Sequence, residues 1–373
     1  MNVLHAVIHG EVAGGQMVCL QIIEALVQQG HQALVISPSE GPFTELLRKK
    51  KISVFIMPFE KTYFFHRAFQ VANLLRKEKI DLVHSHGTVQ MNVHLRLAAR
   101  WTGIPCISHI HINNVFNSNP LIRAYQVFLD RWTSQFCYRL LAVSKAIKES
   151  LVQEGIHHDR IEVIPNGVDC DRLNCRMTRA EVFQRFKIDP DKRLITTIGR
   201  LCPNKGQEEF LQGAKQVNEE MSDTAWMIVG KDLEFDGKYE AKLKTLALDL
   251  GLDGQVIFTG YQGDPLSLLN ACDFFVLPSR MEGMPLVILE AAALKKAVIA
   301  SAVGGVPEIV QDGVTGILIP PSDPQALAVA MLKLLKAPQL AMDMGDAGFR
   351  RVRDHFSTSQ MTHRILELYG EAM

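Results

Sequence analysis

The sequence has no excess of charge, no paired cysteines and no long apolar run, and each absence excludes a class of protein. Its 373 residues carry 40 Lys and Arg against 40 Asp and Glu, so the chain as a whole lacks the positive field of a nucleic-acid-binding protein. The seven cysteines include no CxxC pair, which argues against a disulfide framework and against a cysteine zinc site. No segment reaches the roughly 18–20 apolar residues that cross a bilayer, and residues 1–15 lack the basic start and apolar run of a secretory signal. We expect a cytoplasmic protein that binds no nucleic acid. Binding to the inner face of the cytoplasmic membrane is compatible with these absences.

The balanced total hides an uneven distribution of charge along the chain. Residues 1–175 hold 18 Lys and Arg against 14 Asp and Glu, whereas residues 176–373 hold 22 against 26. Most of the positive excess lies in residues 1–150, where 16 basic residues face 9 acidic ones. The first half is therefore compatible with an anionic membrane or an anionic acceptor.

Short apolar runs alternate with amphipathic stretches, which predicts parallel strands joined by helices. The expected strands are residues 3–8, 33–37, 53–57, 82–85, 106–110, 140–143, 162–164, 194–198, 226–229, 256–258, 274–277, 297–300 and 316–319. The rhythm restarts after a non-periodic polar stretch, and the length exceeds what one core usually organises. We predict an α/β fold of two doubly wound domains that face each other across a cleft, residues 1–175 and residues 176–356. The last segment, 357–373, reads as a helix that packs either on the second domain or back on the first.

A glycine loop follows the first expected strand. Gly10, Gly14 and Gly15 precede a helix, so backbone N–H groups there can approach an anion. The loop is not GxGxxG and no acid ends the second strand at Ser37, which disfavours a dinucleotide oxidoreductase. A tight strand-to-helix turn explains the loop equally well.

A second loop carries two cations after the strand at residues 194–198. Gly199 and Arg200 precede Lys205 and Gly206, where the next helix starts. An Arg fork and a Lys point charge beside a helix N-terminus suit a diphosphate. Solvated loop charges remain the alternative.

The stretch from Ser279 to Glu290 is the most informative one. Glu282 and Gly283 lie on a loop, and Pro285 is placed for a first helical turn. Glu290 follows on an otherwise apolar helix, where its carboxylate needs a partner. That partner is either a structural cation or the ribose hydroxyls of a ligand whose phosphate the N–H groups near residues 283–286 hold.

Four histidines lie at the ends of two expected strands. They are His84, His86, His109 and His111. Residues i and i+2 of a strand point the same way, so the four rings can converge. They suit a zinc site, a polar pocket of neutral imidazoles, or a hydrogen-bonded interior.

A segment of mixed aromatic and basic residues spans Lys61 to Arg67. It contains Tyr63, Phe64 and Phe65 and is followed by Arg76, Lys77 and Lys79. Such a face is typical of one that contacts an anionic membrane or a lipid-linked substrate. The alternative is the solvent-exposed side of an ordinary helix.

Taken together, these pieces resemble the retaining GT-B glycosyltransferases of family GT4, also called glycosyltransferase group 1. The resemblance runs from Gly14 to about Leu332. Its motifs are Asp81-Leu-Val-His84-Ser-His86, Ile161-Glu-Val-Ile-Pro165-Asn166-Gly167-Val168-Asp169, Gly199-Arg200 with Lys205-Gly206, Val229-Gly230, Phe258-Thr-Gly260, Leu277-Pro-Ser279, Glu282 with Glu290, and Gly304-Gly305 through Gly313. Their joint order and spacing carry the assignment.

The resemblance implies a GT-B fold of two Rossmann-like domains, the second of which binds a nucleotide-sugar donor. It implies that Arg200 and Lys205 hold the diphosphate and stabilise the leaving group. It also implies that Glu282 binds the sugar and that His111 contacts it near the anomeric carbon. The residues that it places in donor binding are Gly14, Gly15, Gly199, Gly283, Met284, Pro285, Leu286 and Glu290. Three histidines, His84, His86 and His109, fall on the acceptor side.

The resemblance further implies transfer without a metal or cofactor, because the two cations replace the metal of DxD enzymes. It implies retention of configuration, with the acceptor attacking the face that the diphosphate leaves. The expected acceptor is a lipid-linked or envelope saccharide, with peripheral membrane contact through the first domain. A small soluble sugar or metabolite is the alternative acceptor, and a non-catalytic two-domain sugar-binding protein is the alternative class.

Overall fold

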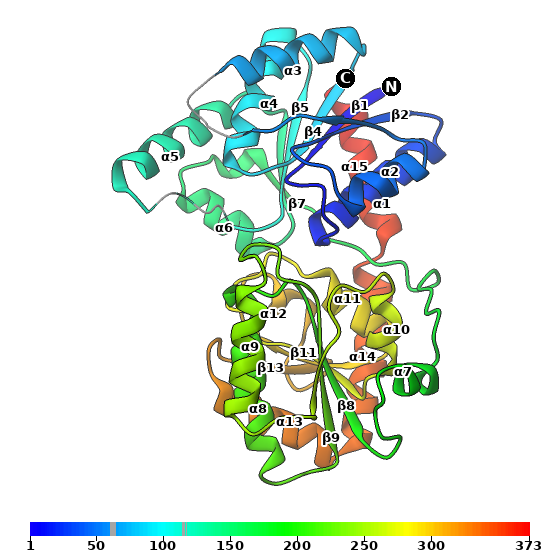
Figure 1. Ribbon diagram of the computed structural model, residues 1–373. Helices are drawn as coiled ribbons and strands as arrows, with labels where there is room; N and C mark the ends of the chain where they lie inside the picture. The colour runs from blue at the N-terminus through cyan, green and yellow to red at the C-terminus, as the bar shows by residue number, and fades with distance from the viewer. Residues whose placement is uncertain (60–64, 114–115, 117) are drawn as a thin grey trace. The chain divides into compact units, whose positions relative to one another are not determined.

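The chain forms two compact units in the computed structural model, which describes residues 1–59, 65–113, 116 and 118–373 (Figure 1). Unit 1 comprises Met1–Gly167 and Thr358–Met373, and unit 2 comprises Val168–Ser357. The division falls between Gly167 and Val168 rather than after residue 175. Val168 pairs with Ser357, and the Cys175 thiol lies 3.6 Å from the Leu266 carbonyl oxygen. Residues 168–175 therefore belong to unit 2.

Unit 1 is built on a seven-stranded parallel sheet with the order β3-β2-β1-β4-β5-β6-β7. Its strands are β1 (Asn2–Val7), β2 (Gln32–Ser37), β3 (Ser53–Ile56), β4 (Leu82–His86), β5 (Cys106–Ile110), β6 (Arg139–Ala142) and β7 (Ile161–Val163). The central strands β4 and β5 are buried along their whole length because helices cover both faces of the sheet.

The connecting helices of unit 1 follow the amphipathic stretches of the sequence. They are α1 (Gly14–Gln28), α2 (Pro42–Lys49), α3 (His66–Lys77), α4 (Val89–Thr102), α5 (Pro120–Ser134) and α6 (Lys145–Gln153), with a 3₁₀ turn at His158–Arg160. Figure 1 shows α1 on one side of the sheet and α3, α4 and α5 on the other.

The last helix, α15 (Thr358–Ala372), packs against α1 in unit 1 (Figure 1). Ile365, Leu368 and Tyr369 on its inner face are fully buried. On its outer side, the Arg364 guanidinium lies 2.6 Å from the carboxylate of Glu162, a residue of β7. These contacts place residues 358–373 with the first unit.

Unit 2 is built on a six-stranded parallel sheet with the order β10-β9-β8-β11-β12-β13. Its strands are β8 (Arg193–Ile198), β9 (Thr224–Val229), β10 (Val256–Phe258), β11 (Phe274–Leu277), β12 (Ala297–Ser301) and β13 (Gly316–Ile319). Its helices are α7 (Arg179–Arg185), α8 (Gln207–Asn218), α9 (Lys238–Asp249), α10 (Pro265–Ala271), α11 (Leu286–Ala293), α12 (Val306–Ile309), α13 (Pro324–Lys336) and α14 (Pro338–His355). Its core contains an edge-to-face pair, Phe210 and Trp226, with ring centroids 5.7 Å apart.

None of the helices that the structure describes is long and apolar enough to cross a membrane.

Candidate active site

Each sheet has one point where the strand order reverses, and the predicted loops follow the strands that flank it. In unit 2 the neighbours β8 and β11 flank the reversal, and they lead into residues 199–206 and 278–285. In unit 1 the neighbours β1 and β4 flank it, and β1 leads into the glycine loop before α1. Ligands of open α/β sheets bind beyond the carboxyl ends of strands at such points. The fold therefore places the predicted loops where a ligand site is expected.

The Lys205 ammonium is held against the Glu282 carboxylate in unit 2. Their Nζ and Oε1 atoms lie 2.6 Å apart, and the two side chains are only 20% and 7% exposed. Gly206 fixes the loop in place because its φ is +69° and a Cβ there would lie 2.0 Å from the Pro278 carbonyl oxygen. Only glycine fits this approach, which brings the loops after β8 and β11 together.

Arg200 forms an ion pair with Glu234, a residue that the sequence analysis did not single out. Glu234 lies on the loop between β9 and α9, which Asp232 organises by accepting hydrogen bonds from the backbone N–H groups of Glu234, Phe235 and Tyr239. Burial raises the pKa of the Asp232 carboxyl, but these hydrogen bonds outweigh burial and hold that pKa below its ordinary value.

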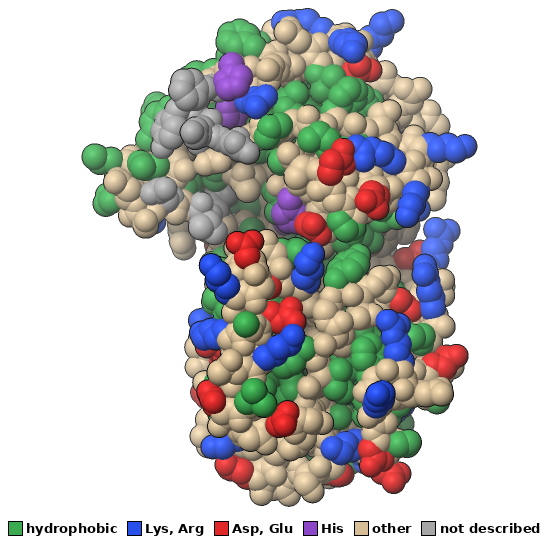
Figure 2. All heavy atoms as spheres, in the orientation of Figure 1, with side chains coloured by type: hydrophobic (Ala, Val, Ile, Leu, Met, Phe, Trp, Pro, Cys, Tyr) green, Lys and Arg blue, Asp and Glu red, His purple; other side chains and the backbone are tan. Residues whose placement is uncertain are grey.

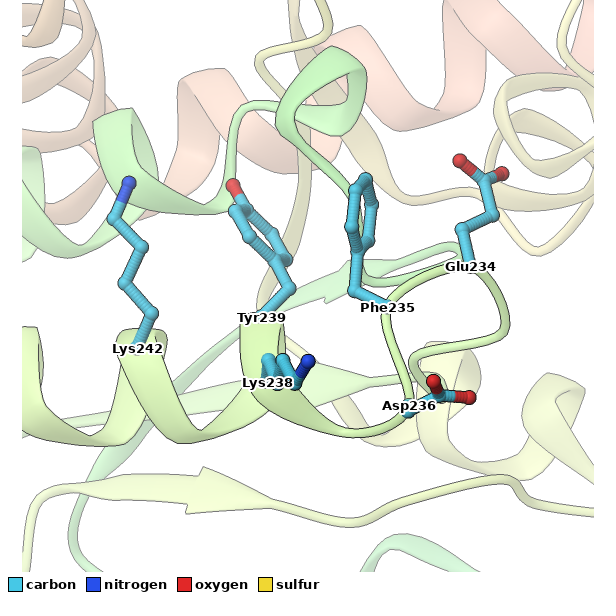
Figure 3. Close-up of a pocket in the computed structure, with 6 residues that line it drawn as sticks. All are labelled: Glu234, Phe235, Asp236, Lys238, Tyr239 and Lys242. Carbon is cyan, nitrogen blue, oxygen red and sulfur yellow. The ribbon is translucent and has the colours of Figure 1, made fainter.

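The side chains of this loop form a surface pocket (Figure 3). Glu234, Phe235, Tyr239 and Lys242 rise from the loop and from α9 on the same side in that view. The Lys242 ammonium and the Tyr239 hydroxyl both contact the Glu208 carboxylate, at 2.8 Å and 3.0 Å. Each cation of the predicted diphosphate loop has a carboxylate partner: Arg200 pairs with Glu234, and Lys205 pairs with Glu282.

The segment from Glu282 to Leu286 is pinned by the loop after β12. Gly304 has a φ of +52°, and a Cβ there would lie 1.7 Å from the Glu282 carbonyl oxygen. The Gly305 N–H donates to the Gly283 carbonyl oxygen at 2.8 Å. Pro285 occupies the N-cap of α11 rather than its first turn, and no side chain caps that helix. Gly283, Met284, Pro285 and Leu286 are all buried, so this segment offers backbone rather than flexible side chains.

Glu290 is a partly buried carboxyl on α11. Burial raises its pKa to about 7. Among the described residues its side chain has no hydrogen bond or ion pair, so the structural cation considered in the sequence analysis is not its partner. An unpartnered carboxyl in this place can accept hydrogen bonds from a ligand.

Gly14 and Gly15 begin α1 in unit 1, at the carboxyl end of β1. The N-cap residue Ala13 offers no side-chain acceptor, which leaves the first N–H groups of α1 without a side-chain cap. A Cβ on Gly15 would lie 3.5 Å from the His111 ring, so the glycine loop and this histidine are neighbours. Nothing within 4 Å surrounds the Cβ position of Gly14.

The four predicted histidines converge because β4 and β5 are adjacent strands. The ring centroids are 4.3 Å apart for His84 and His86, 5.4 Å for His84 and His109, and 4.3 Å for His109 and His111. A fifth ring, His5 of β1, joins them, and the sequence analysis missed it. Burial, reinforced by repulsion between the rings, lowers the pKa of His84, His86 and His109 well below the ordinary value.

Two groups in this cluster could hold a metal ion among the described residues. They are His5 with Cys19 and His86, and His84 with His86 and His109, with ligand atoms in each group within 4.8 Å of one another. Neither group includes a carboxylate. His111 is in neither group.

The aromatic and basic segment predicted as a membrane contact lies partly outside the described residues. Lys61, Tyr63 and Phe64 are among the residues that the structure does not describe. Among the described residues on or beside α3, Arg76, Lys77 and Lys79 are exposed and Arg67 is half-buried.

Comparison with known proteins agrees with this architecture. The family described as Glycosyl transferases group 1 matches residues 178–351, and Glycosyltransferase Family 4 matches residues 12–172. The chain is 27% identical over 380 residues to the UDP-Gal:alpha-D-GlcNAc-diphosphoundecaprenol alpha-1,3-galactosyltransferase of Escherichia coli, covering 99% of this chain and 96% of the relative. It is 24% identical to the N,N'-diacetylbacillosaminyl-diphospho-undecaprenol alpha-1,3-N-acetylgalactosaminyltransferase of Campylobacter jejuni, covering 95% of both chains.

A solved structure has the same fold along the whole chain. HepE of Anabaena, in complex with UDP and glucose, superposes with a TM-score of 0.88 at 21% identity and covers 100% of both chains. Fold, family matches and relatives agree, and the chain belongs to the group 1 glycosyltransferases, family 4, with the GT-B fold.

Proposed function

We propose that this enzyme transfers a sugar from a nucleotide-diphosphate sugar to an acceptor hydroxyl with retention of configuration. The observation that carries the proposal is the placement of Arg200 and Lys205 beside the reversal point of the unit 2 sheet, with Glu282 in contact with Lys205. A diphosphate leaving group develops negative charge as its bond to the sugar breaks, and fixed cations stabilise that charge.

The proposed step forms one bond and breaks one. The acceptor oxygen bonds to the anomeric carbon on the face from which the diphosphate leaves, while the bond from that carbon to the diphosphate oxygen breaks. The acceptor proton passes to the departing diphosphate oxygen. Arg200 and Lys205 bind that diphosphate, so no divalent metal or cofactor is needed and we expect transfer to survive EDTA.

The other site residues have binding roles in this proposal. Glu290 accepts hydrogen bonds from ribose hydroxyls, and Glu282 with the backbone of residues 283–286 binds the sugar. Gly199 lies beside the Lys205 stem, where a Cβ would make an ordinary contact at 3.6 Å, and its backbone is proposed to face the diphosphate. In unit 1, Gly14 and Gly15 expose N–H groups to the phosphates, and His111 contacts the transferred sugar.

We propose a lipid-linked saccharide as the acceptor and the cytoplasmic face of the membrane as the place of work. The support is twofold. The two relatives named above have diphospho-undecaprenol sugars in their names. Unit 1 also exposes an apolar stripe on α5, which consists of Leu121, Tyr125, Phe128 and Trp132.

The α5 stripe has the spacing of one helical face. Leu121 is 82% exposed and Phe128 61% exposed, and Arg123 and Arg131 on the same helix are also exposed. Exposed aromatic and apolar side chains next to cations suit the interface of an anionic bilayer. Figure 2 shows hydrophobic side chains over the end of unit 1 where Figure 1 places α5.

The experiment is a transfer assay with radiolabelled UDP-, GDP- and ADP-hexoses on diphosphoundecaprenol-linked saccharides, run with and without EDTA. Arg200→Ala and Lys205→Ala are each expected to lower transfer by about 10²-fold or more, since each removes several kcal/mol of leaving-group stabilisation. Lys192→Ala, at a half-buried position just before β8 in unit 2, is the control. Near-normal turnover in both site variants would overturn the assignment, and transfer only to a free soluble sugar would replace the lipid-linked acceptor.

A further inference from the structure

Three histidines of unit 1 form a continuous hydrogen-bonded chain. His5 Nδ1 lies 3.4 Å from His86 Nε2, and His86 Nδ1 lies 2.9 Å from His111 Nε2. The chain therefore runs from β1 through β4 to the end of β5. Its two end atoms, His5 Nε2 and His111 Nδ1, are buried and have no hydrogen-bond partner among the described residues.

The three rings are neutral. His5 and His86 are buried and His111 is half-buried, and no carboxylate among the described residues contacts the three rings. Burial lowers the pKa of His5 to about 3 and that of His111 to about 4. A neutral imidazole carries one N–H donor and one acceptor nitrogen. Three neutral rings thus share three protons, two of which fill the hydrogen bonds between them.

Only two arrangements of these protons keep both hydrogen bonds. In the first, all three rings are protonated at Nε2, which leaves an N–H at His5 Nε2 and a lone pair at His111 Nδ1. In the second, all three are protonated at Nδ1, which leaves a lone pair at His5 Nε2 and an N–H at His111 Nδ1. The tautomer of His111 is therefore coupled to that of His5, two rings away.

The second arrangement is the better one for this interior. The first would bury an N–H donor at His5 Nε2 with no acceptor, and orphaned buried donors are rarer than orphaned acceptors. The second puts the unmatched N–H at His111 Nδ1, an atom that is also buried, but the His111 residue is partly exposed and lies next to the glycine loop, whereas His5 is fully buried. A ligand oxygen can satisfy the donor there.

A metal ion at this cluster would break the chain. Both ring nitrogens of His86 are engaged by His5 and His111, yet His86 belongs to both candidate ligand groups. Metal binding would therefore cost at least one hydrogen bond and bury a divalent charge with no carboxylate in either group.

We propose that His5 and His86 are positioning residues that fix His111 as the Nδ1–H tautomer, so that it donates a hydrogen bond to an oxygen of the transferred sugar. The part that concerns the sugar rests on the proposed function. The tautomer chain itself does not, because it is a property of the protein without substrate.

The decisive test is a two-bond ¹H–¹⁵N correlation spectrum of the full-length protein labelled with ¹⁵N in its histidine rings. Single-histidine variants assign the signals, and no substrate is added. We expect His5, His86 and His111 all to be protonated at Nδ1. Protonation of any of them at Nε2, or one equivalent of a tightly bound transition metal by elemental analysis, would overturn the proposal.

A variant tests the coupling across the chain. His5→Leu does not touch His111, yet we expect it to turn the single His111 tautomer into a mixture and to lower kcat/KM about threefold to tenfold. Tyr369→Phe is the matched control, because it removes the hydroxyl that lies 2.5 Å from His84 Nδ1 and leaves the chain intact. An unchanged His111 spectrum in His5→Leu would contradict the coupling.

The two proposals fail in different ways. A spectrum as expected in a protein without transfer activity contradicts the proposed function alone. Mixed tautomers in a protein with normal transfer contradict the positioning role alone. If His5→Leu does not fold, the spectrum of the unaltered protein still decides.

Discussion

At the scale of single residues, Arg200 and Lys205 of the proposed donor-binding loop, residues 199–206, differ in how firmly they are paired. The Lys205–Glu282 pair is largely buried, whereas the Arg200 and Glu234 side chains are 36% and 43% exposed. Exposed ion pairs contribute only about 0–1 kcal/mol. A diphosphate can therefore displace Glu234 from Arg200 at little cost, whereas Glu282 is better placed to stay with Lys205.

Glu234→Gln is expected to tighten binding of a free nucleoside diphosphate by up to about fivefold, because it removes a competing charge whose ion pair is worth about 1 kcal/mol or less. Isothermal titration calorimetry measures this change. Glu240→Gln, which removes the partner of Lys244 on the same helix, is the control and should leave the affinity unchanged. Weaker binding in Glu234→Gln would mean that Glu234 holds Arg200 in its binding position.

If Glu290 binds the ribose as proposed, it makes nucleotide binding dependent on pH. Its pKa is about 7 in the free protein, and hydrogen bonds from ribose hydroxyls favour its ionised form. Binding therefore releases a proton below pH 7, and affinity should fall by about tenfold between pH 8 and pH 6 from this group. Glu290→Gln should bind more weakly at pH 8 and lose this part of the dependence. Equal pH profiles for the two proteins, measured by calorimetry with the same diphosphate, would remove Glu290 from the ribose site.

Sequence reasoning found the residues whose neighbours in the chain reveal them. The loop from Gly199 to Gly206 and the Glu282 to Glu290 stretch follow strands that read clearly as apolar runs. Glu234 and His5 were missed because their partners lie far away in the sequence. His5 meets His86 only through the pairing of β1 with β4, and strand order is not written in local periodicity.

At the scale of elements, every expected strand is present within a residue or two, because strands of a covered parallel sheet are continuous apolar runs. The docking of α15 could not be predicted. Its amphipathic pattern predicts that one face of the helix is buried, but it does not predict which surface of the protein that face packs against. That surface consists of α1 and of His84 on β4, whose Nδ1 atom lies 2.5 Å from the Tyr369 hydroxyl of α15, and both belong to unit 1.

Leu368→Ala is expected to destabilise unit 1 by about 2–5 kcal/mol, since it empties a fully buried site between α15 and the unit that α15 covers. Urea unfolding followed by circular dichroism measures the loss. Leu248→Ala on α9, where the side chain is 59% exposed, is the control and should change stability by less than about 0.5 kcal/mol. A small effect of Leu368→Ala would show that α15 is not part of the unit 1 core.

At the scale of the whole molecule, the zero net charge conceals charge excesses of opposite sign in the two halves. The basic excess of residues 1–175 lies in the half that carries the α5 stripe, and the acidic excess lies in the half with the proposed donor loops. The proposals therefore place membrane attraction and nucleotide binding in different units. The overall composition hides this difference in charge, whereas the count by halves reveals it.

This division predicts how the protein binds vesicles. Leu121→Ser with Phe128→Ser should lower binding to phosphatidylglycerol-containing vesicles by about tenfold or more, because each apolar side chain contributes on the order of 1 kcal/mol or more when it leaves water. The control pair is Leu248→Ser with Val329→Ser, which removes exposed apolar side chains, 59% and 60% exposed, from unit 2. Sedimentation with anionic and with neutral vesicles separates the apolar contribution from the electrostatic one, which added salt should weaken. Equal losses in both pairs would mean that binding is not confined to α5, and unchanged binding in the α5 pair would leave the basic residues of unit 1 as the membrane contact.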